Sequence, residues 1–560
     1  MRASKIKIFF ALSLVIMASC NKQLSPLLND PSSPTPAAAD VDLYLNNLQL
    51  NFKSFYVDAS DIADQVVRQE TMFGPTYFNA YGPTSFDDMW NKAYQSVFLT
   101  ANTMIPLAEE KSEFTHAGIA QVLKAYTMFT MVDFFGDVPY SEADLGVGNT
   151  NPKVDKGADI YAAAIALLDS SIANFAKTSS VAPANDLFYG GSATKWATLA
   201  KTLKLKAYMQ TRLVDNTAAT KVAALLTDGD LIKTSAQDFV FSFSTHNSAP
   251  DSRAPHYTNN YGTDNGASDY LGNYFMWCLR DEKSMHDPRT PYYIYRQITD
   301  VTNTADPRVP NQTTLQFALA CYYRTSPYPA GSPYCIIDNS YWGRDHGNNE
   351  GTGPDNLLKS TWGVYPAAGE FDANQNKSVG TSTGRIKGAG GNGILPIWLS
   401  SYTYFLRAEA ALLLGTGEDP KAMMTSGIEA SMSKVAAFPA AIGYTLPTTD
   451  TSFLITAYKK QKYESLVQSI YDNSTSDGDR LNVIEKEYYL AAWGNGIEPY
   501  NNYRRTSKPD NFQTALYGNQ GDFIQSFFYA SVYVNYNKNA VQKAVTSTKV
   551  FWDTNPDVLK

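Results

Sequence analysis

The chain has 560 residues, which is enough for several compact domains or for one large scaffold with insertions. Hydrophobic residues make up 44% of it and charged residues 18%, so it can bury a core and is not disordered as a whole. The formal net charge of −8 argues against a nucleic-acid-binding protein, which needs a basic surface. The mean hydropathy of −0.29 excludes a polytopic membrane protein.

The first residues predict export and a lipid anchor. Three basic residues precede an apolar stretch, residues 8–17, that is too short to span a bilayer but suits a signal peptide. Small residues then lead into Cys20, a pattern that looks like a lipobox, in which the cysteine is lipidated and becomes the new N-terminus. We expect residues 1–19 to be a lipoprotein signal peptide and Cys20 to be the lipidation site. An ordinary secretory signal that contains a cysteine is the alternative.

Residues 20–40 predict a flexible tether. Four prolines stand among Ser and Ala there, which prevents regular structure. An extended chain of this kind gains about 3.1 Å per residue, so the tether would reach roughly 60 Å. A single acyl chain binds membranes only marginally, so a stable anchor at Cys20 needs more than one.

Helical periodicity dominates two regions, residues 41–245 and 395–560. Apolar residues recur there at helical spacing in ten segments, near residues 41–57, 86–110, 115–135, 157–177, 192–215, 217–227, 396–415, 420–437, 452–471 and 482–494. Short connections between neighbouring segments favour stacked helix pairs. The predicted fold class is therefore mainly α.

Individual residues in these regions suggest structural roles. Ser192 is placed to cap a helix, and Gly136 in the segment FFGDVPY to end one. The tryptophans are expected to anchor the core, as at Trp196, Trp398 and Trp493. Glu409 lies on an apolar helix stripe and is expected to be a buried, paired carboxylate, for which the candidate partners are Arg504 and Arg505.

Residues 246–394, here called the middle region, differ from both flanks. They contain 16 of the 35 glycines and 13 of the 37 tyrosines. Gly and Pro are too dense for long helices, yet the aromatic content argues against disorder. We expect an ordered insertion with short strands and long surface loops.

The cysteines agree with export but leave their state open. Besides Cys20, the chain has Cys278, Cys321 and Cys335. The spacing of Cys321 and Cys335 suits a loop-closing disulfide, and free or buried thiols are the equal alternative.

Catalytic motifs fail on their context. A GxSxG match at residues 380–384 and a GxGxxG match at residues 388–393 lack the strand and helix that such motifs require. The five histidines show no metal-binding spacing. We expect no catalytic residue, no cofactor and no metal, although a pair of glycosidase carboxylates is invisible in sequence.

Six segments, taken in chain order behind the Cys20 motif, carry a resemblance to a known family. They are Phe134–Tyr140, Gly191–Lys206, Asp287–Arg289, the stretch from Pro396 to Leu412, Glu485–Thr506 and Phe528–Ser531. Together they look like the SusD/RagB family of nutrient-binding outer-membrane lipoproteins of Bacteroidetes, over essentially the whole mature chain.

The resemblance implies an architecture and a partner. It implies TPR-like helix pairs that support an irregular ligand-binding face, and a non-catalytic binder of oligosaccharides or peptides. It also implies a SusC-like TonB-dependent transporter as the partner, and an outer-membrane location with a lipid anchor, facing the cell exterior. A glycan is favoured over a peptide because aromatic planes cover the apolar faces of sugar rings.

Aromatic residues of the loops are the candidate ligand contacts. The set comprises Tyr77, Tyr81, Tyr322, Tyr328, Tyr341, Trp342, Arg344 and Trp362. The alternative is that these rings fill the core of a glycine-rich insertion. At the level of function, the alternatives to glycan capture are a surface glycan-degrading hydrolase lipoprotein and a helical scaffold protein without a small ligand.

Overall fold

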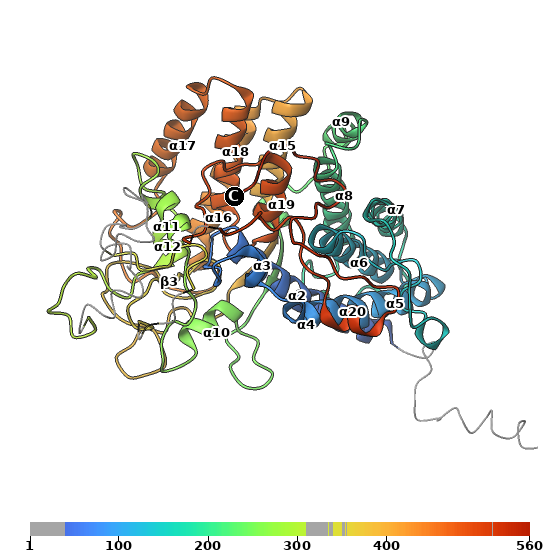
Figure 1. The fold of residues 1–560 in the computed structure, drawn as a ribbon, viewed down its shortest axis with the longest axis horizontal. Coiled ribbons are helices and arrows are strands. Elements are labelled where there is room, and N and C mark those ends of the chain that lie inside the picture. The colour runs from blue at the N-terminus through green and yellow to red at the C-terminus, as the bar shows by residue number, and fades with distance from the viewer. Residues whose placement is uncertain (1–39, 310–333, 335–339, 350–352, 354, 518) are drawn as a thin grey trace, which may run out of the picture.

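The computed structural model describes residues 40–309, 334, 340–349, 353, 355–517 and 519–560. Over these residues the protein is mainly α-helical. Figure 1 shows the N-terminal helices to the right, α15 to α19 (residues 400–506) at the top, the loop-rich middle region to the left, and the last helix, α20 (Ser531–Tyr536), beside the N-terminal α4 (Asp87–Asn91). The predicted fold class, helix pairs beside a loop-rich region, is confirmed. The domain limits at residues 245 and 395 stay a prediction.

The N-terminal part is a series of helices, some joined by short turns and others by longer loops such as residues 176–192. They are α2 (Val41–Val66), α3 (Tyr77–Ala80), η2 (Pro83–Phe86), α4 (Asp87–Asn91), η3 (Lys92–Phe98), α5 (Leu99–Glu110), α6 (Phe114–Phe135), η4 (Gly146–Gly148), α7 (Gly157–Phe175), α8 (Ala193–Gln210), α9 (Ala218–Asp228) and η5 (Ser235–Gln237). As predicted, the Ser192 hydroxyl caps α8 and α6 ends at Gly136. Gly136 has a φ of 75°, a conformation that favours glycine.

Glycine permits close packing within the helix pairs. A Cβ atom on Gly118 of α6 would lie 2.5 Å from the ring of Phe175, the last residue of α7. One on Gly427 of α16 would lie 2.9 Å from the ring of Phe405 in α15. A glycine inside a helix costs about 1 kcal/mol relative to alanine. At both positions this lower helix propensity accompanies close packing of a partner ring against the helix backbone.

The C-terminal part contains α15 (Ser400–Leu414), α16 (Pro420–Ala441), α17 (Ala457–Asp472), α18 (Asp477–Ala491), α19 (Ile497–Thr506) and α20 (Ser531–Tyr536). Two features differ from the sequence prediction. The segment expected to start a helix near residue 396 begins instead with the strand β4 (Ile394–Trp398), which contains a proline. Helix α19 was not expected because its buried residues include Asn, Arg and Glu, which hides the apolar periodicity.

Buried ion pairs connect α19 to the rest of the scaffold. The Arg505 guanidinium lies 2.6 Å from Glu409 of α15, and Arg212 lies 2.9 Å from the same carboxylate. Burial alone would raise the pKa of Glu409, but the two arginines outweigh it and lower that pKa to about 2. The pairing predicted for Glu409 is confirmed for Arg505. It is wrong for Arg504, which donates instead to the backbone carbonyl groups of Asp133 and Gln525.

The middle region begins and ends in paired strands. Strand β1 (Phe239–Ser242) pairs with β4 in antiparallel orientation, and β2 (Ile294–Tyr295) pairs with β3 (Thr361–Trp362). Three short helices were not expected, α10 (Pro255–Tyr261), α11 (Asn273–Arg280) and α12 (Thr290–Tyr293). Gly and Pro residues at their ends keep them short rather than preventing them.

The loop assignment of the two glycine motifs is confirmed, since residues 380–384 and 388–393 contain no helix or strand. None of the helices formed by the described residues is both long enough and apolar enough to pass through a bilayer.

Candidate functional site

The side chains predicted to contact ligand are mostly buried. Five of them lie in the interior, namely Tyr77, Tyr341, Trp342, Arg344 and Trp362. Tyr81 is partly buried, and its hydroxyl donates to the side-chain oxygen of Gln65. Tyr322 and Tyr328 lie outside the described residues.

These buried rings hold the middle region together. Trp342 packs in a small apolar core with Ile298 and Leu358, and its indole nitrogen donates to Asp355 at 3.1 Å. Trp362 is stacked between His256 and Trp493, with ring centroids 3.7 and 3.9 Å away. A buried ring offers no face to a ligand, so the expectation that these side chains line a groove is corrected to a packing role.

The cysteine predictions cannot be followed in the structure. Cys20, Cys321 and Cys335 lie outside the described residues. Cys278 of α11 is a buried free thiol, and burial raises its pKa to about 12.

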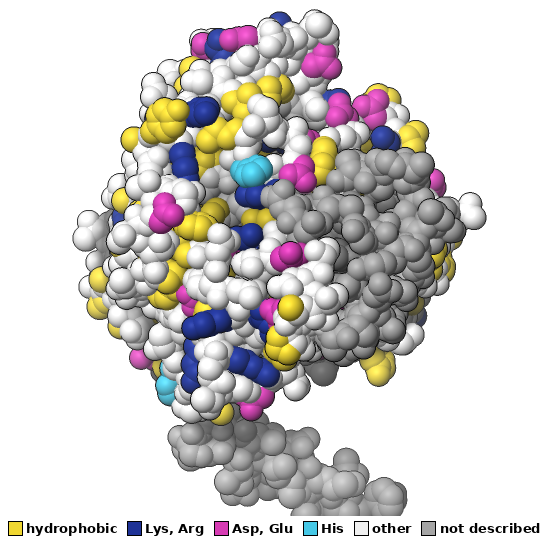
Figure 2. All heavy atoms as spheres, turned by 90° about the vertical axis from the view of Figure 1, so that its left-hand side faces the viewer, with side chains coloured by type: hydrophobic (Ala, Val, Ile, Leu, Met, Phe, Trp, Pro, Cys, Tyr) yellow, Lys and Arg dark blue, Asp and Glu magenta, His cyan; other side chains and the backbone are white. Residues whose placement is uncertain are grey.

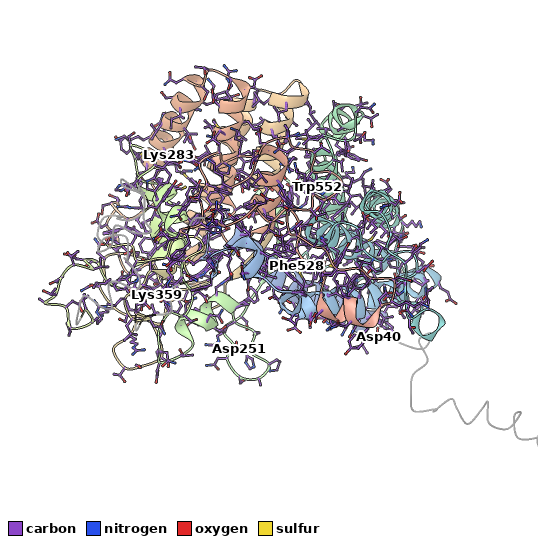
Figure 3. All side chains as sticks on the ribbon, in the orientation of Figure 1. Asp40, Asp251, Lys283, Lys359, Phe528 and Trp552 are labelled. Atoms are coloured by element: carbon purple, nitrogen blue, oxygen red, sulfur yellow. The ribbon has the colours of Figure 1, made fainter. Side chains whose placement is uncertain are left out.

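The loop that precedes α4 exposes other rings than those predicted. Phe73 is 44% exposed and Phe78 is 58% exposed, whereas Tyr77 between them is buried. The Phe78 ring meets Phe528, which is labelled in Figure 3, with 5.4 Å between centroids. Figure 2 views the side that carries the middle region, where the described residues present a mixture of charged, polar and apolar side chains.

A concave aromatic surface occurs on the helical part instead, between α4, η3 and α20. This α4–α20 groove has a volume of about 550 Å³ and is closed on one side by residues 139–152. Its lining residues are Trp90, Asn91, Tyr94, Gln95, Pro139, Ala143, Asp144, Gly146, Asn149, Thr150, Pro152, Val532, Tyr533, Tyr536 and Asn537.

Stacked rings underlie the α4–α20 groove, and two of them, Trp90 and Tyr533, are almost fully buried, so the exposed Tyr536 offers the open ring face. Trp90 is stacked on Tyr533 and on Tyr94, with centroid distances of 4.6 and 5.0 Å. Tyr536 is 82% exposed at the edge of the groove. Rings that are already packed against one another present a rigid surface at little entropic cost.

Amide and hydroxyl groups surround these rings. The Gln95 amide donates to Asn91 at 3.1 Å, so the remaining amide groups of both side chains stay available. Asn149 and Thr150 contribute further polar atoms from the opposite wall. Asn91 precedes η3, a π-helical segment, and Gln95 lies within it. Such segments are frequent at functional sites.

Asp87 fixes the two walls of the α4–α20 groove relative to each other. Its carboxylate, in the first turn of α4, accepts hydrogen bonds from the backbone amide of Val532 at 3.0 Å and from the hydroxyl of Ser531. The contact caps α20 and sets the position of Tyr533 and Tyr536. The sequence placed a helix over residues 86–110 but gave no signal that α20 would pack beside it.

A second groove is larger and strongly polar. It lies between α15, α16 and α17, has a volume of about 1060 Å³, and is lined mainly by Ser, Thr, Lys and Glu side chains. Partial burial and the neighbouring Glu429 carboxylate raise the pKa of Glu464 to about 7. Lys460 lies 2.5 Å from Glu429.

Two family models match the sequence, and between them they cover most of the chain. Residues 34–307 match the SusD-like family described as "starch-binding associating with outer membrane". Residues 389–553 match the family described as "Susd and RagB outer membrane lipoprotein". The matches define a class of outer-membrane-associated binding lipoprotein. The chain belongs to the SusD/RagB family.

Solved structures share the fold at low sequence identity. A SusD/RagB family protein from Bacteroides thetaiotaomicron is 19% identical with a TM-score of 0.66, over 93% of this chain and 100% of its own. A chitin-binding protein is 18% identical with a TM-score of 0.62, over 93% and 100%. A chitin-binding SusD homologue from Flavobacterium johnsoniae is 17% identical with a TM-score of 0.58, over 91% and 99%. No curated protein matches the chain.

Proposed function

We propose that this protein captures an extracellular glycan without cleaving it and delivers it to a SusC-like TonB-dependent transporter in the outer membrane. The Cys20 motif and the tether of residues 20–40 would hold it on the membrane, facing the cell exterior. The description of the matching family as outer-membrane lipoproteins supports this location. The printed descriptions of starch binding and chitin binding among its relatives support a glycan as ligand.

The observation that carries the proposal is the combination of rings and amides in the α4–α20 groove. A pyranose ring has apolar C–H faces, which an aromatic plane such as that of Tyr536 can cover. Its equatorial hydroxyl groups need hydrogen-bond partners, which Asn91 and Gln95 offer beside the stacked rings. A volume of about 550 Å³ accommodates two or three sugar units and is within the range of ligand pockets.

The carboxylates of the polar groove are not arranged for glycoside hydrolysis, which supports binding without turnover. Glycoside hydrolysis needs two carboxyl groups about 5–9 Å apart, with the scissile bond between them. Glu464 and Glu429 lie against each other and interact directly, which raises the Glu464 pKa and leaves no room for a sugar between them. Lys460, paired with Glu429, further occupies this position.

The proposal is tested with the exported protein, residues 21–560, and soluble chitin and maltose oligosaccharides. Isothermal titration measures affinity, and chromatography of the same mixtures measures cleavage products. We expect one of the two oligosaccharide series to bind and neither to be shortened. Product formation, or the absence of binding to both series, would refute glycan capture.

The Tyr536→Ala variant locates the site. Loss of one aromatic contact of about 1.4 kcal/mol lowers affinity about tenfold. Tyr458→Ala is the matched control, since Tyr458 on α17 is 70% exposed and lies outside the α4–α20 groove. Equal affinities of the two variants would move the site away from the groove. Co-purification of the lipidated protein with an outer-membrane barrel tests the transporter partner.

A further inference from the structure

An acidic cluster around His256 joins α2 to the middle region. Asp61 and Asp64 stand one turn apart on α2, Glu70 follows this helix, and Asp269 comes from the loop before α11. The imidazole of His256 in α10 lies between these side chains. Its Nε2 atom is 3.3 Å from Asp61, and its Nδ1 atom is 3.7 Å from Glu70 and 3.8 Å from Asp269.

Negative charge exceeds positive charge in this cluster. In the part of the chain that the structure describes, none of the four carboxylates forms an ion pair with a Lys or Arg side chain, and His256 is the one basic partner of three of them. Buried carboxylates need a compensating cation or a proton.

One carboxylate oxygen of the cluster has no partner. Asp64 is completely buried. One of its oxygens accepts a hydrogen bond from the Ser60 hydroxyl at 3.3 Å, whereas its Oδ1 atom has no hydrogen-bond partner among the described residues. A buried carboxylate oxygen without a partner is unfavourable, so this position calls for a ligand.

Space for a single small ligand lies beside these groups. A cavity of about 20 Å³ is lined by Ser60, Asp61 and His256 among mostly apolar residues, and Asp64 is not part of this lining. The volume is enough for one ion or one water molecule. Candidate donor atoms of Asp61, Asp64 and His256 all lie within 4.8 Å of one another. Donors bound tetrahedrally to one ion at about 2.1 Å are about 3.4 Å apart, so side-chain shifts of up to about 1.4 Å close the set.

We propose that Asp61, Asp64 and the Nε2 atom of His256 bind a divalent transition-metal ion of the Zn²⁺ type. One imidazole nitrogen with carboxylate oxygens suits Zn²⁺, while Ca²⁺ and Mg²⁺ prefer oxygen ligands alone. The sequence gave no metal-binding spacing, because the histidine and the aspartates are almost 200 positions apart.

Glu70 and Asp269 complete the site from behind. With the metal on Nε2, the proton of His256 is on Nδ1. This atom lies 3.7 and 3.8 Å from the two carboxylates, too far for a direct hydrogen bond, so they act on the imidazole through their charge. Asn260 donates to Asp269 at 2.7 Å, and the Trp362 indole donates to Glu70 at 2.8 Å, so both carboxylates are themselves held in place. Lys359, labelled in Figure 3, donates to the backbone oxygen of the neighbouring Ser268.

The metal is a cross-link between the helical scaffold and the middle region. Its ligands belong to α2 on one side and to α10 on the other, so it stabilises their contact and not a reaction. The inference is independent of glycan binding, which the α4–α20 groove carries.

The test titrates metal-stripped protein with two ions. Calorimetry measures the binding of Zn²⁺, and visible absorption measures the binding of Co²⁺. We expect one Zn²⁺ per chain, a Co²⁺ spectrum typical of a nitrogen and oxygen site, a higher Tm with Zn²⁺, and no such binding of Ca²⁺. His256→Gln and Asp64→Asn should each weaken Zn²⁺ binding at least tenfold. His246→Gln, at an exposed histidine outside the cluster, is the matched control and should bind like the unchanged protein.

Asp61→Asn guards against misfolding, because Asp61 is partly exposed at the cavity and its amide keeps the shape of the side chain. This variant should fold, as judged by circular dichroism, and bind Zn²⁺ at least tenfold more weakly. Failure of the unchanged protein to bind Zn²⁺ would overturn the proposal. So would full affinity in Asp61→Asn or His256→Gln.

Discussion

The helical scaffold and the middle region both contain fully buried tryptophans, but only in the scaffold does the sequence reveal this. Trp196 and Trp398 belong to a helix and to a strand beside one, and Trp342 and Trp362 belong to loops and a two-residue strand. All four are fully buried. In a helix, the 3.6-residue period tells which side chains face the core. In an irregular chain no period exists, so aromatic richness cannot distinguish a ligand-facing surface from an interior.

Removing one partner of the buried ion pair in the scaffold should have the largest effect. Glu409→Ala leaves the Arg505 and Arg212 side chains without their carboxylate, and an uncompensated buried charge costs about 3–5 kcal/mol. Urea unfolding measures the loss. Asp472→Ala is the control, because its pair with Lys421 is exposed and should matter by less than about 0.5 kcal/mol.

Removing a loop tryptophan should lower the free energy of unfolding nearly as much as removing a buried scaffold residue. Trp342→Ala removes the largest ring of a small core and should destabilise the middle region by about 3 kcal/mol, while the scaffold stays folded. Hydrogen exchange, read separately for residues 246–394 and for the helices, checks this. Unchanged protection combined with lost glycan binding would restore Trp342 to a ligand-contacting role.

Two neighbouring carboxyl groups of the scaffold core, Glu409 and Glu485, should differ in how they make stability depend on pH. Burial, and then the Glu409 carboxylate, raise the pKa of Glu485 well above its ordinary value. The folded protein therefore keeps a proton that the unfolded chain releases above about pH 4.3, and stability falls as the pH rises.

Glu485→Gln removes this dependence. Its stability relative to the unchanged protein should grow by up to about 1.4 kcal/mol for each pH unit above 4.3, until the pKa of the folded state is passed. Urea midpoints of both proteins at pH 5 and pH 8 give the comparison. Equal differences at the two pH values would show that Glu485 is ionised in the folded protein.

The smallest effect is expected at the exposed loop ring. Phe78→Ala should change the free energy of unfolding by less than about 0.5 kcal/mol, since the side chain is mostly exposed. Glycan affinity should also be unchanged if the α4–α20 groove is the site. A loss of affinity here, with Tyr536→Ala unaffected, would place the ligand on the loop side.

The scaffold was largely predictable because its residues follow simple rules. The cap at Ser192 and the helix end at Gly136 follow from local chemistry. The pairing of Glu409 with Arg505 follows from the rule that a buried carboxylate needs a cation. Helix α19 escaped because buried Asn and Arg side chains replace its apolar stripe. Buried polar groups find partners that are close in space but distant in the chain. Such pairs leave no periodic pattern in the sequence.

The groove and the His256 cluster were beyond prediction for a different reason. Each is assembled from segments far apart in the chain, α4 with α20 in the first case and α2 with α10 in the second. Tyr536 and Asp61 look like ordinary surface residues in sequence. Their partners become visible only once the packing of the helices is known.

The pairing of β1 with β4 has one more consequence. Phe243 donates its backbone N–H group to the Gly393 carbonyl at 2.9 Å, so the chain leaves the helices and re-enters them at nearly the same point. An excursion whose two ends are already tied together can change length at little entropic cost. The segment between them can thus change length in its outer loops without moving the two points at which it joins the helices.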